Sequence, residues 1–263
     1  MNRLISTQYF KDYRKELGFT NQSDLKKFFA AKDITPTVDY NYIKLLNARL
    51  IKIIKKINLL VSNDIKIDDI DKFCANNIDN VFNTLKDSNI IQRLNNQGRR
   101  PEQVYFSWMR GYIVANYFLK ALSKIFGVNL ENISLIGDDD LDNIESFKRT
   151  PTADLEIVLN DGNRLRIEVQ SGFVGVNDIK QHKVLEAKRI FEKDGISSLA
   201  IHFDLFNGQV AFVKLDTIEE NSVNWITRQQ MEGQTVFNID QNSFSWKLTD
   251  KTPSLSEIFS ERI

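Results

Sequence analysis

Two runs of alternating apolar and polar residues, separated by a turn sequence, constrain the fold of this chain most. The aliphatic residues of the two runs are Leu155, Ile157 and Leu159, followed by Leu165, Ile167 and Val169. Strict alternation is typical of strands with one buried face. Asn160-Asp161-Gly162 lies between the runs and suits a three-residue hairpin loop that ends with Gly162 in the left-handed conformation. The segment is therefore predicted to be a β-hairpin.

The loop length sets which residues face each other. A three-residue loop places Asp154 opposite Glu168, and it keeps all the aliphatic residues on the other face. It also places Glu156 opposite Arg166, which predicts an ordinary cross-strand ion pair. A two-residue turn would set Leu155 opposite Glu168 and mix the faces, so we reject it. Like charges directly opposite each other destabilise a sheet, and the acidic pair therefore needs a shared cation.

The expected cation is Mg²⁺, for which Mn²⁺ should substitute. Mg²⁺ prefers oxygen ligands and typically takes one or two carboxylates together with phosphate oxygens of a substrate. Asp154, Glu168 and the backbone carbonyl of Val169 are the predicted ligands, and Gln170 projects on the same face. Such a metal lowers the pKa of a bound water and neutralises charge on a phosphodiester. The pattern therefore indicates phosphodiester hydrolysis.

This pattern resembles the active site of the PD-(D/E)XK nuclease superfamily, which includes most type II restriction endonucleases. Asp154 matches the first acid, although Thr152-Ala153 stand where a strict motif has Pro next to Asp. Glu168 matches the second acid. Gln170 stands where Lys is usual, a departure that some restriction enzymes of the family share. The resemblance implies that both acids bind Mg²⁺ and that Gln170 orients the attacking water.

Gln carries no charge, so the metal or a lysine from elsewhere must help to activate the water. Lys180 and Lys183 are the candidates, because they lie on a helix that the periodicity predicts over residues 177–194. Strands are predicted over 197–206 and 209–215. Hairpin, crossover helix and strand follow each other in the order of the family's common core.

A long helix is predicted upstream, over residues 101–126, with Pro at its start and Gly127 at its end. Members of the family often carry a Glu on this helix that approaches the metal. Glu102 is the only acid on the predicted helix, and we expect it to assist catalysis. The alternative is that Glu102 only complements the positive helix N-terminus.

The N-terminal region is predicted to be helical over residues 8–17, 23–31, 40–60 and 68–85. Residues 1–126 have a net charge of +9 and residues 127–263 a net charge of −9, a division that suits a protein gripping phosphates with its first half. Side chains of the types that bind phosphates or read base edges are expected to contact DNA, with an ordinary solvated surface as the alternative. These residues are Arg49, Lys52, Lys56, Asn96, Gln97, Arg99, Arg100, Lys180 and Lys183.

Composition excludes several other kinds of protein. Cys74 is the single cysteine, and His182 and His202 are the only histidines, so a thiolate or histidine zinc site is not expected. No apolar run reaches the ~18 residues that span a bilayer, and the N-terminus lacks a signal-peptide core. We therefore expect an intracellular, cytoplasmic protein, and the resemblance to restriction endonucleases implies a prokaryotic enzyme. Beyond the core, a second hairpin is predicted from strands 235–239 and 243–248, followed by a helix over 254–260.

The sequence thus predicts an α/β fold like that of restriction endonucleases, with a mixed sheet flanked by helices. Residues 1–98 form a helical recognition region and residues 99–263 the catalytic core, within one compact unit. The predicted function is that of a type II restriction endonuclease on double-stranded DNA, with a cognate DNA methyltransferase as functional partner and a homodimer as the expected assembly. The alternatives are a DNA repair or structure-specific nuclease of the same fold, or a catalytically inactive DNA-binding protein.

Overall fold

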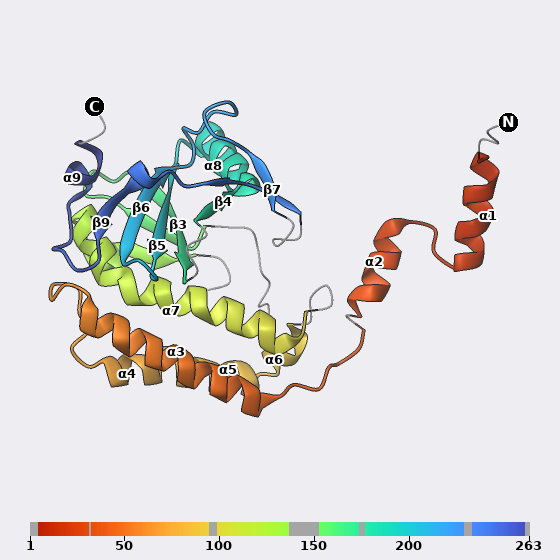
Figure 1. Ribbon diagram of the computed structural model, residues 1–263, viewed down its shortest axis with the longest axis horizontal. Helices are drawn as coiled ribbons and strands as arrows, with labels where there is room; N and C mark the ends of the chain where they lie inside the picture. The colour runs from red at the N-terminus through yellow and green to blue at the C-terminus, as the bar shows by residue number, and fades with distance from the viewer. Residues whose placement is uncertain are drawn as a thin grey trace.

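The protein has a mixed α/β fold, which confirms the predicted class (Figure 1). A helical N-terminal region is followed by a six-stranded mixed sheet with helices on both faces, and a small three-stranded sheet lies beside it. The computed structural model describes residues 5–31, 33–94, 99–136, 153–173, 177–228 and 233–260.

The N-terminal helices lie close to the predicted positions. They are α1 (Thr7–Leu17), α2 (Gln22–Ala30), α3 (Tyr40–Leu60), α4 (Ile70–Cys74), α5 (Val81–Asp87) and α6 (Ile90–Arg93). The helix predicted over 68–85 is divided, because a π-helical segment (Ala75–Asn80) separates α4 from α5. Helices α1 and α2 extend away from the rest of the molecule, and neither contains a buried residue (Figure 1).

Helix α7 (Pro101–Phe126) has the predicted bounds and lies between helix α3 and the sheet (Figure 1). Pro101 begins it, and Gly127 ends it with a positive φ of 62°. Most of its side chains are buried, and α3 packs against it. Two buried polar pairs tie the helices together: Asn47 Nδ2 donates to Tyr105 Oη at 3.0 Å, and Tyr117 Oη donates to Asn58 Oδ1 at 2.7 Å.

The main sheet has the strand order β1-β2-β3-β5-β6-β9. Its strands are β1 (Ile133–Leu135), β2 (Leu155–Val158), β3 (Arg164–Gly172), β5 (Ser197–Asp204), β6 (Gln209–Lys214) and β9 (Phe244–Lys247). Only β3 and β5 pair in parallel among these neighbours, and α8 (Gln181–Asp194) lies in the connection between them. Helix α7 packs on one face of the sheet and α8 on the other (Figure 1).

The β2–β3 hairpin has the predicted register. Glu156 pairs with Arg166, and the N–H of Leu159 donates to the carbonyl of Asn163 at 2.8 Å. The three residues between Leu159 and Asn163 form the loop, and Gly162 has the expected left-handed φ of 83°. The aliphatic face of the hairpin is buried in the main core against α7, whereas the polar face points to the side of α8.

Two details of the prediction are wrong beyond β3. The helix expected from residue 177 begins at Gln181, because residues 178–180 form strand β4 (Asp178–Lys180). The C-terminal strands do not form a hairpin with each other. Strand β8 (Gln234–Asn238) pairs with β4 and with β7 (Ile226–Arg228) in the small sheet, whereas β9 pairs with β6.

Burial explains this division of the C-terminal strands. Phe237 of β8 is buried with Ile179 of β4 in a second core beneath α8, whereas Trp246 of β9 and the adjacent Leu248 belong to the main core. Each strand therefore pairs at the position where its apolar side chains are buried in one of the two cores. Helix α9 (Leu255–Ser260) follows near the predicted position.

Candidate functional site

The two predicted metal-binding acids lie side by side in the hairpin. Asp154 directly precedes β2, and its N–H donates to the carbonyl of Ile167 at 3.1 Å. Its carboxylate reaches across to β3, where Oδ2 accepts the N–H of Val169 at 2.7 Å. The bonds to the residues on either side of Glu168 place Asp154 next to it, as the register predicts. Backbone geometry, and not a flexible loop, therefore sets the position of the Asp154 carboxylate.

The second acid is held by a lysine from α8. Lys183 Nζ lies 2.7 Å from Glu168 Oε2, and the two side chains are only 19% and 12% exposed. Lys183, one of the two lysines predicted to replace the motif lysine, thus contacts the acidic pair. Lys180 is the last residue of β4 and is half-buried.

Helix α8 begins with an unusual concentration of positive charge. Lys183 is in its first turn, Lys180 is its N-cap, and no acidic residue lies in that turn. Helix N-termini normally favour acidic side chains, because the helix dipole is positive there. Burial lowers the pKa of His182, and the charges of Lys180 and Lys183 lower it further. The helix therefore directs a positive field towards the end of the hairpin.

Glu156 does not belong to the acidic pair, because two arginines engage it. Arg164 Nε donates to Glu156 Oε1 at 2.9 Å, whereas Arg166 Nε lies 3.8 Å from the other carboxylate oxygen. The predicted pairing with Arg166 is therefore present, but the closer partner is Arg164. Sequence reasoning missed this because it compared only directly opposite residues, and long side chains also reach diagonal neighbours.

Gln170 follows Glu168 by two residues in β3, so the two side chains are on the same face of the strand. It pairs with His202 of β5 in the parallel ladder. His202 is buried, and its Nε2 lies 2.7 Å from Asn177 Oδ1. Burial lowers the pKa of His202, and this outweighs the opposing effect of Asp204 and Asp178. No sequence motif marks His202, and its position in a predicted strand is the one available signal.

Glu102 is engaged elsewhere. Its Oε1 accepts the N–H of Asp39 at 2.8 Å, and the Arg100 guanidinium donates to both of its oxygens at 2.9 and 3.2 Å. Burial opposes its ionisation, but these hydrogen bonds prevail and hold the pKa of Glu102 below its usual range. Glu102 therefore joins the start of α7 to the start of α3. This geometry favours the structural alternative over the expected catalytic role.

Of the residues expected to contact DNA, Lys183 contacts the acidic pair, whereas those on α3 lie elsewhere. Arg49, Lys52 and Lys56 are exposed on α3, whose buried face packs towards α7, so they lie on the far side of α7 from the sheet (Figure 1). Arg100 pairs with Glu102, and Arg99 is half-buried. Asn96 and Gln97 lie outside the described residues.

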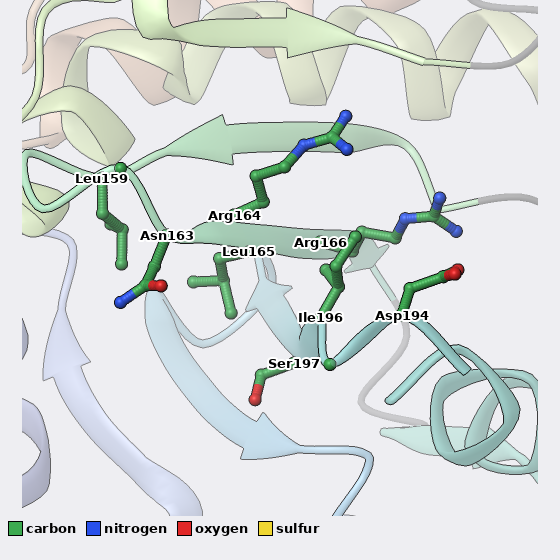
Figure 2. A pocket seen from close by; sticks show the side chains of 10 residues that line it. Leu159, Asn163, Arg164, Leu165, Arg166, Asp194, Ile196 and Ser197 are labelled. Atoms are coloured by element: carbon green, nitrogen blue, oxygen red, sulfur yellow. The ribbon is translucent and has the colours of Figure 1, made fainter. Parts of the chain in front are cut away.

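A cavity lies at the other end of the hairpin. It measures about 790 Å³ and lies between the hairpin loop and the loop that follows α8, where Asn163, Asp194 and Ser197 line it. Figure 2 shows that the guanidinium groups of Arg164 and Arg166 point to the opposite side of β3 from Leu165. Neither Asp154 nor Glu168 lines this cavity. A hollow of about 20 Å³ adjoins Glu168 and Lys183 instead.

The donor set of the acidic pair fits Mg²⁺ better than a zinc ion. Within the described ranges, no group of three or more His, Cys, Asp or Glu side chains is placed to hold a metal. A structural zinc site needs about four such ligands, whereas Mg²⁺ accepts one or two carboxylates and completes its shell with water and phosphate. Asp154 and Glu168 supply that number.

Comparisons with models of protein families, with curated proteins and with solved structures find no match to this chain. No helix in the described part of the chain is long and apolar enough to cross a membrane.

Proposed function

We propose that this protein is a Mg²⁺-dependent endodeoxyribonuclease that hydrolyses phosphodiester bonds in double-stranded DNA, and more specifically a type II restriction endonuclease. The observation that carries the proposal is the arrangement of Asp154, Glu168 and Lys183. Asp154 and Glu168 are neighbours across the two strands at the end of a hairpin, and an ammonium group from the crossover helix contacts Glu168. The order of long helix, hairpin, crossover helix and strand adds support, since the PD-(D/E)XK resemblance implies this order.

Each residue has a definite role in the proposed reaction. Asp154 and Glu168 would hold Mg²⁺, and the metal when bound would offset charge on the phosphodiester and favour ionisation of water. Gln170 orients the attacking water by hydrogen bonding. Lys183 places a positive charge beside the phosphate as a pentavalent, more negative arrangement develops. The water oxygen bonds to phosphorus as the bond from phosphorus to the leaving sugar oxygen breaks. The water proton passes to solvent, and the leaving oxygen takes up a proton from solvent.

The proposed function also implies a partner enzyme, a cellular location and an oligomeric state. A restriction enzyme works beside a cognate DNA methyltransferase, in the cytoplasm of a prokaryotic cell, and palindromic sites favour a homodimer. A second function, DNA binding without catalysis, is supported by two features of the site. Gln170 replaces the usual lysine, and Lys183 already neutralises Glu168. This favours, as the alternative, a DNA-binding protein that keeps the fold without catalysis.

One assay separates these functions. The protein is incubated with phage DNA in Mg²⁺, in Ca²⁺ and in a chelator. Discrete fragments in Mg²⁺ alone support the restriction enzyme, whereas a smear or cleavage of branched DNA alone indicates a repair nuclease. A gel shift without cleavage indicates the DNA-binding protein.

The site is tested with matched variants. Asp154→Asn and Glu168→Gln should each abolish cleavage and leave the thermal midpoint within a few degrees of the parent. Glu192→Gln is the control, because Glu192 is exposed on α8 and makes none of these contacts. Full cleavage by either site variant would refute the assignment.

A further inference from the structure

His202 lies beside the proposed site, on the strand next to β3. The parallel register pairs Gln170 with His202 and Glu168 with Ala200. Paired residues of adjacent strands point to the same face and lie about 4.8 Å apart. Ala200 is buried in the core beneath α8, which shows that this face of β5 looks towards α8. His202 is therefore on the same face of the sheet as the acidic pair. It lies beside Gln170, two residues further along than the pair of Glu168 and Ala200.

The hydrogen bonds of His202 leave one ring nitrogen without a partner. Nε2 lies 2.7 Å from Asn177 Oδ1, an acceptor, so Nε2 carries the proton. In a neutral imidazole Nδ1 is then an acceptor. This atom is buried and has no hydrogen-bond partner within the part of the chain that the structure describes. The ring of Phe244 is nearly perpendicular to the imidazole, with the ring centres 6.2 Å apart, and carries no hydrogen-bond donor of this kind.

The charged groups around His202 are also occupied. Asp204 accepts hydrogen bonds from the N–H groups of Phe206 and Asn207, and Asp178 is held by Arg228. Both are carboxylates, and neither can donate to Nδ1 when ionised. The donor that is missing must therefore come from a neighbouring side chain or from water.

Gln170 carries the matching donor. Its side-chain amide makes no hydrogen bond to any residue in the described ranges, and its NH₂ group can donate two. An amide can present either its oxygen or its nitrogen to a nearby water. Without a partner that fixes it, Gln170 would orient the attacking water in two opposite ways.

We propose that Nδ1 of His202 accepts a hydrogen bond from the NH₂ group of Gln170 and thereby turns the amide oxygen towards the attacking water. The inference rests on the proposed nuclease function. The amide oxygen accepts a hydrogen from the water, which leaves a lone pair of the water free to point at phosphorus. His202 is a positioning residue, because it acts through Gln170. Burial keeps it neutral near pH 7, so that Nδ1 stays an acceptor.

The hydrogen bond is tested by NMR, independently of cleavage. The chain has two histidines, so the imidazole ¹⁵N resonances of the labelled full-length protein are assigned with a His182→Gln variant. We expect His202 to carry its proton on Nε2, and Gln170→Leu to move its Nδ1 resonance towards that of an unbonded acceptor. His182 resonances should not move. A proton on Nδ1, or an Nδ1 resonance unchanged by Gln170→Leu, would overturn the pairing.

The positioning role is tested with a double-mutant cycle. His202→Phe and Gln170→Leu should each lower kcat on the order of 10- to 100-fold with little change in KM. The double variant should be no slower than Gln170→Leu alone, because His202 acts through Gln170. If the double variant instead shows the product of the two single reductions in kcat, His202 only supports the fold, and the positioning role is overturned. If the parent protein cuts no DNA in Mg²⁺, the nuclease function and this role both fail, while the NMR result still decides the hydrogen bond.

Discussion

Lys183 and Glu168 face each other between α8 and β3, with Nζ of the lysine 2.7 Å from Oε2 of the acid. Both side chains are mostly buried, so solvent screens this pair less than an exposed one. The ammonium group therefore offsets the charge of Glu168 when no metal is bound. A divalent cation must share Glu168 with Lys183 or displace it.

Replacing Lys183 should separate metal binding from catalysis. Lys183→Met removes the competing charge, so we expect Mg²⁺ to bind about tenfold more tightly, a change of about 1.4 kcal/mol. We also expect kcat to fall roughly 10²–10³-fold, because a charge beside the reacting phosphate is lost. Calorimetry measures the first effect and single-turnover cleavage the second. Lys193→Met, on the exposed end of α8, should change neither, and unchanged cleavage by Lys183→Met would remove the lysine from the mechanism.

Glu102→Gln tests whether Glu102 is structural or catalytic. The substitution removes the charge that the Asp39 N–H and the Arg100 guanidinium bind, so we expect the free energy of unfolding to fall by about 1–3 kcal/mol. Cleavage at a temperature where the variant is folded should equal that of the parent. Chemical denaturation and a cleavage assay check the two parts. A folded variant that has lost cleavage would restore Glu102 to the catalytic site.

The same residue makes a prediction for pH. The pKa of Glu102 is lower in the folded protein than its usual value, so the unfolded chain binds the proton more readily. Its contribution to stability is present above the unfolded pKa of about 4.3 and is lost as the pH falls through the folded value. Between pH 5 and pH 3, the stability of the parent should therefore fall more steeply than that of Glu102→Gln. Parallel curves of unfolding free energy against pH would contradict this.

Two glycines should respond oppositely to alanine. Gly162 has a φ of 83° in the hairpin loop, and a side chain there costs about 1–2 kcal/mol even though the space around it is open. Gly111 lies on the exposed surface of α7 with nothing near an added Cβ, so Gly111→Ala should stabilise the protein by about 0.5–1 kcal/mol. Denaturation midpoints of the two variants test this. A stabilising Gly162→Ala would show that the loop does not need its left-handed residue.

The hairpin register was predictable, whereas the partners of the later strands were not. Local signals suffice at the hairpin, because Gly162 fixes the loop and alternation fixes the faces. No local signal says that Phe237 enters the core under α8 while Trp246 enters the main core, since that depends on surfaces distant in sequence. The early start predicted for α8 has a local cause: Asn177 and Asp178 are residue types that often cap helices, and pairing with β8 overrides them.

The site was predictable to a similar extent. Register placed Asp154 beside Glu168, but the contact of Lys183 with Glu168 depends on how α8 crosses the sheet. The basic first turn of α8 was the available signal, because it opposes the helix dipole. The catalytic role expected of Glu102 also depended on contacts distant in sequence. The N–H of Asp39, at the start of α3, binds Glu102, and no local signal predicts that contact.

Helices α1 and α2 should contribute little to the stability of the rest of the protein. Neither contains a buried residue, although Tyr13 and Phe29 are large and exposed. Deleting residues 1–34 should therefore change the thermal midpoint by no more than a few degrees. Differential scanning calorimetry checks this. A large loss would show that these helices pack against the rest of the protein, or against a second copy, in solution.

The most direct test of the shared-cation claim is isothermal titration calorimetry with Mn²⁺ and uncleavable duplex DNA. The parent protein should take up Mn²⁺, whereas Asp154→Asn and Glu168→Gln should each weaken uptake at least tenfold and Glu192→Gln should leave it unchanged. No uptake by the parent, or equal uptake by all four proteins, would contradict the account.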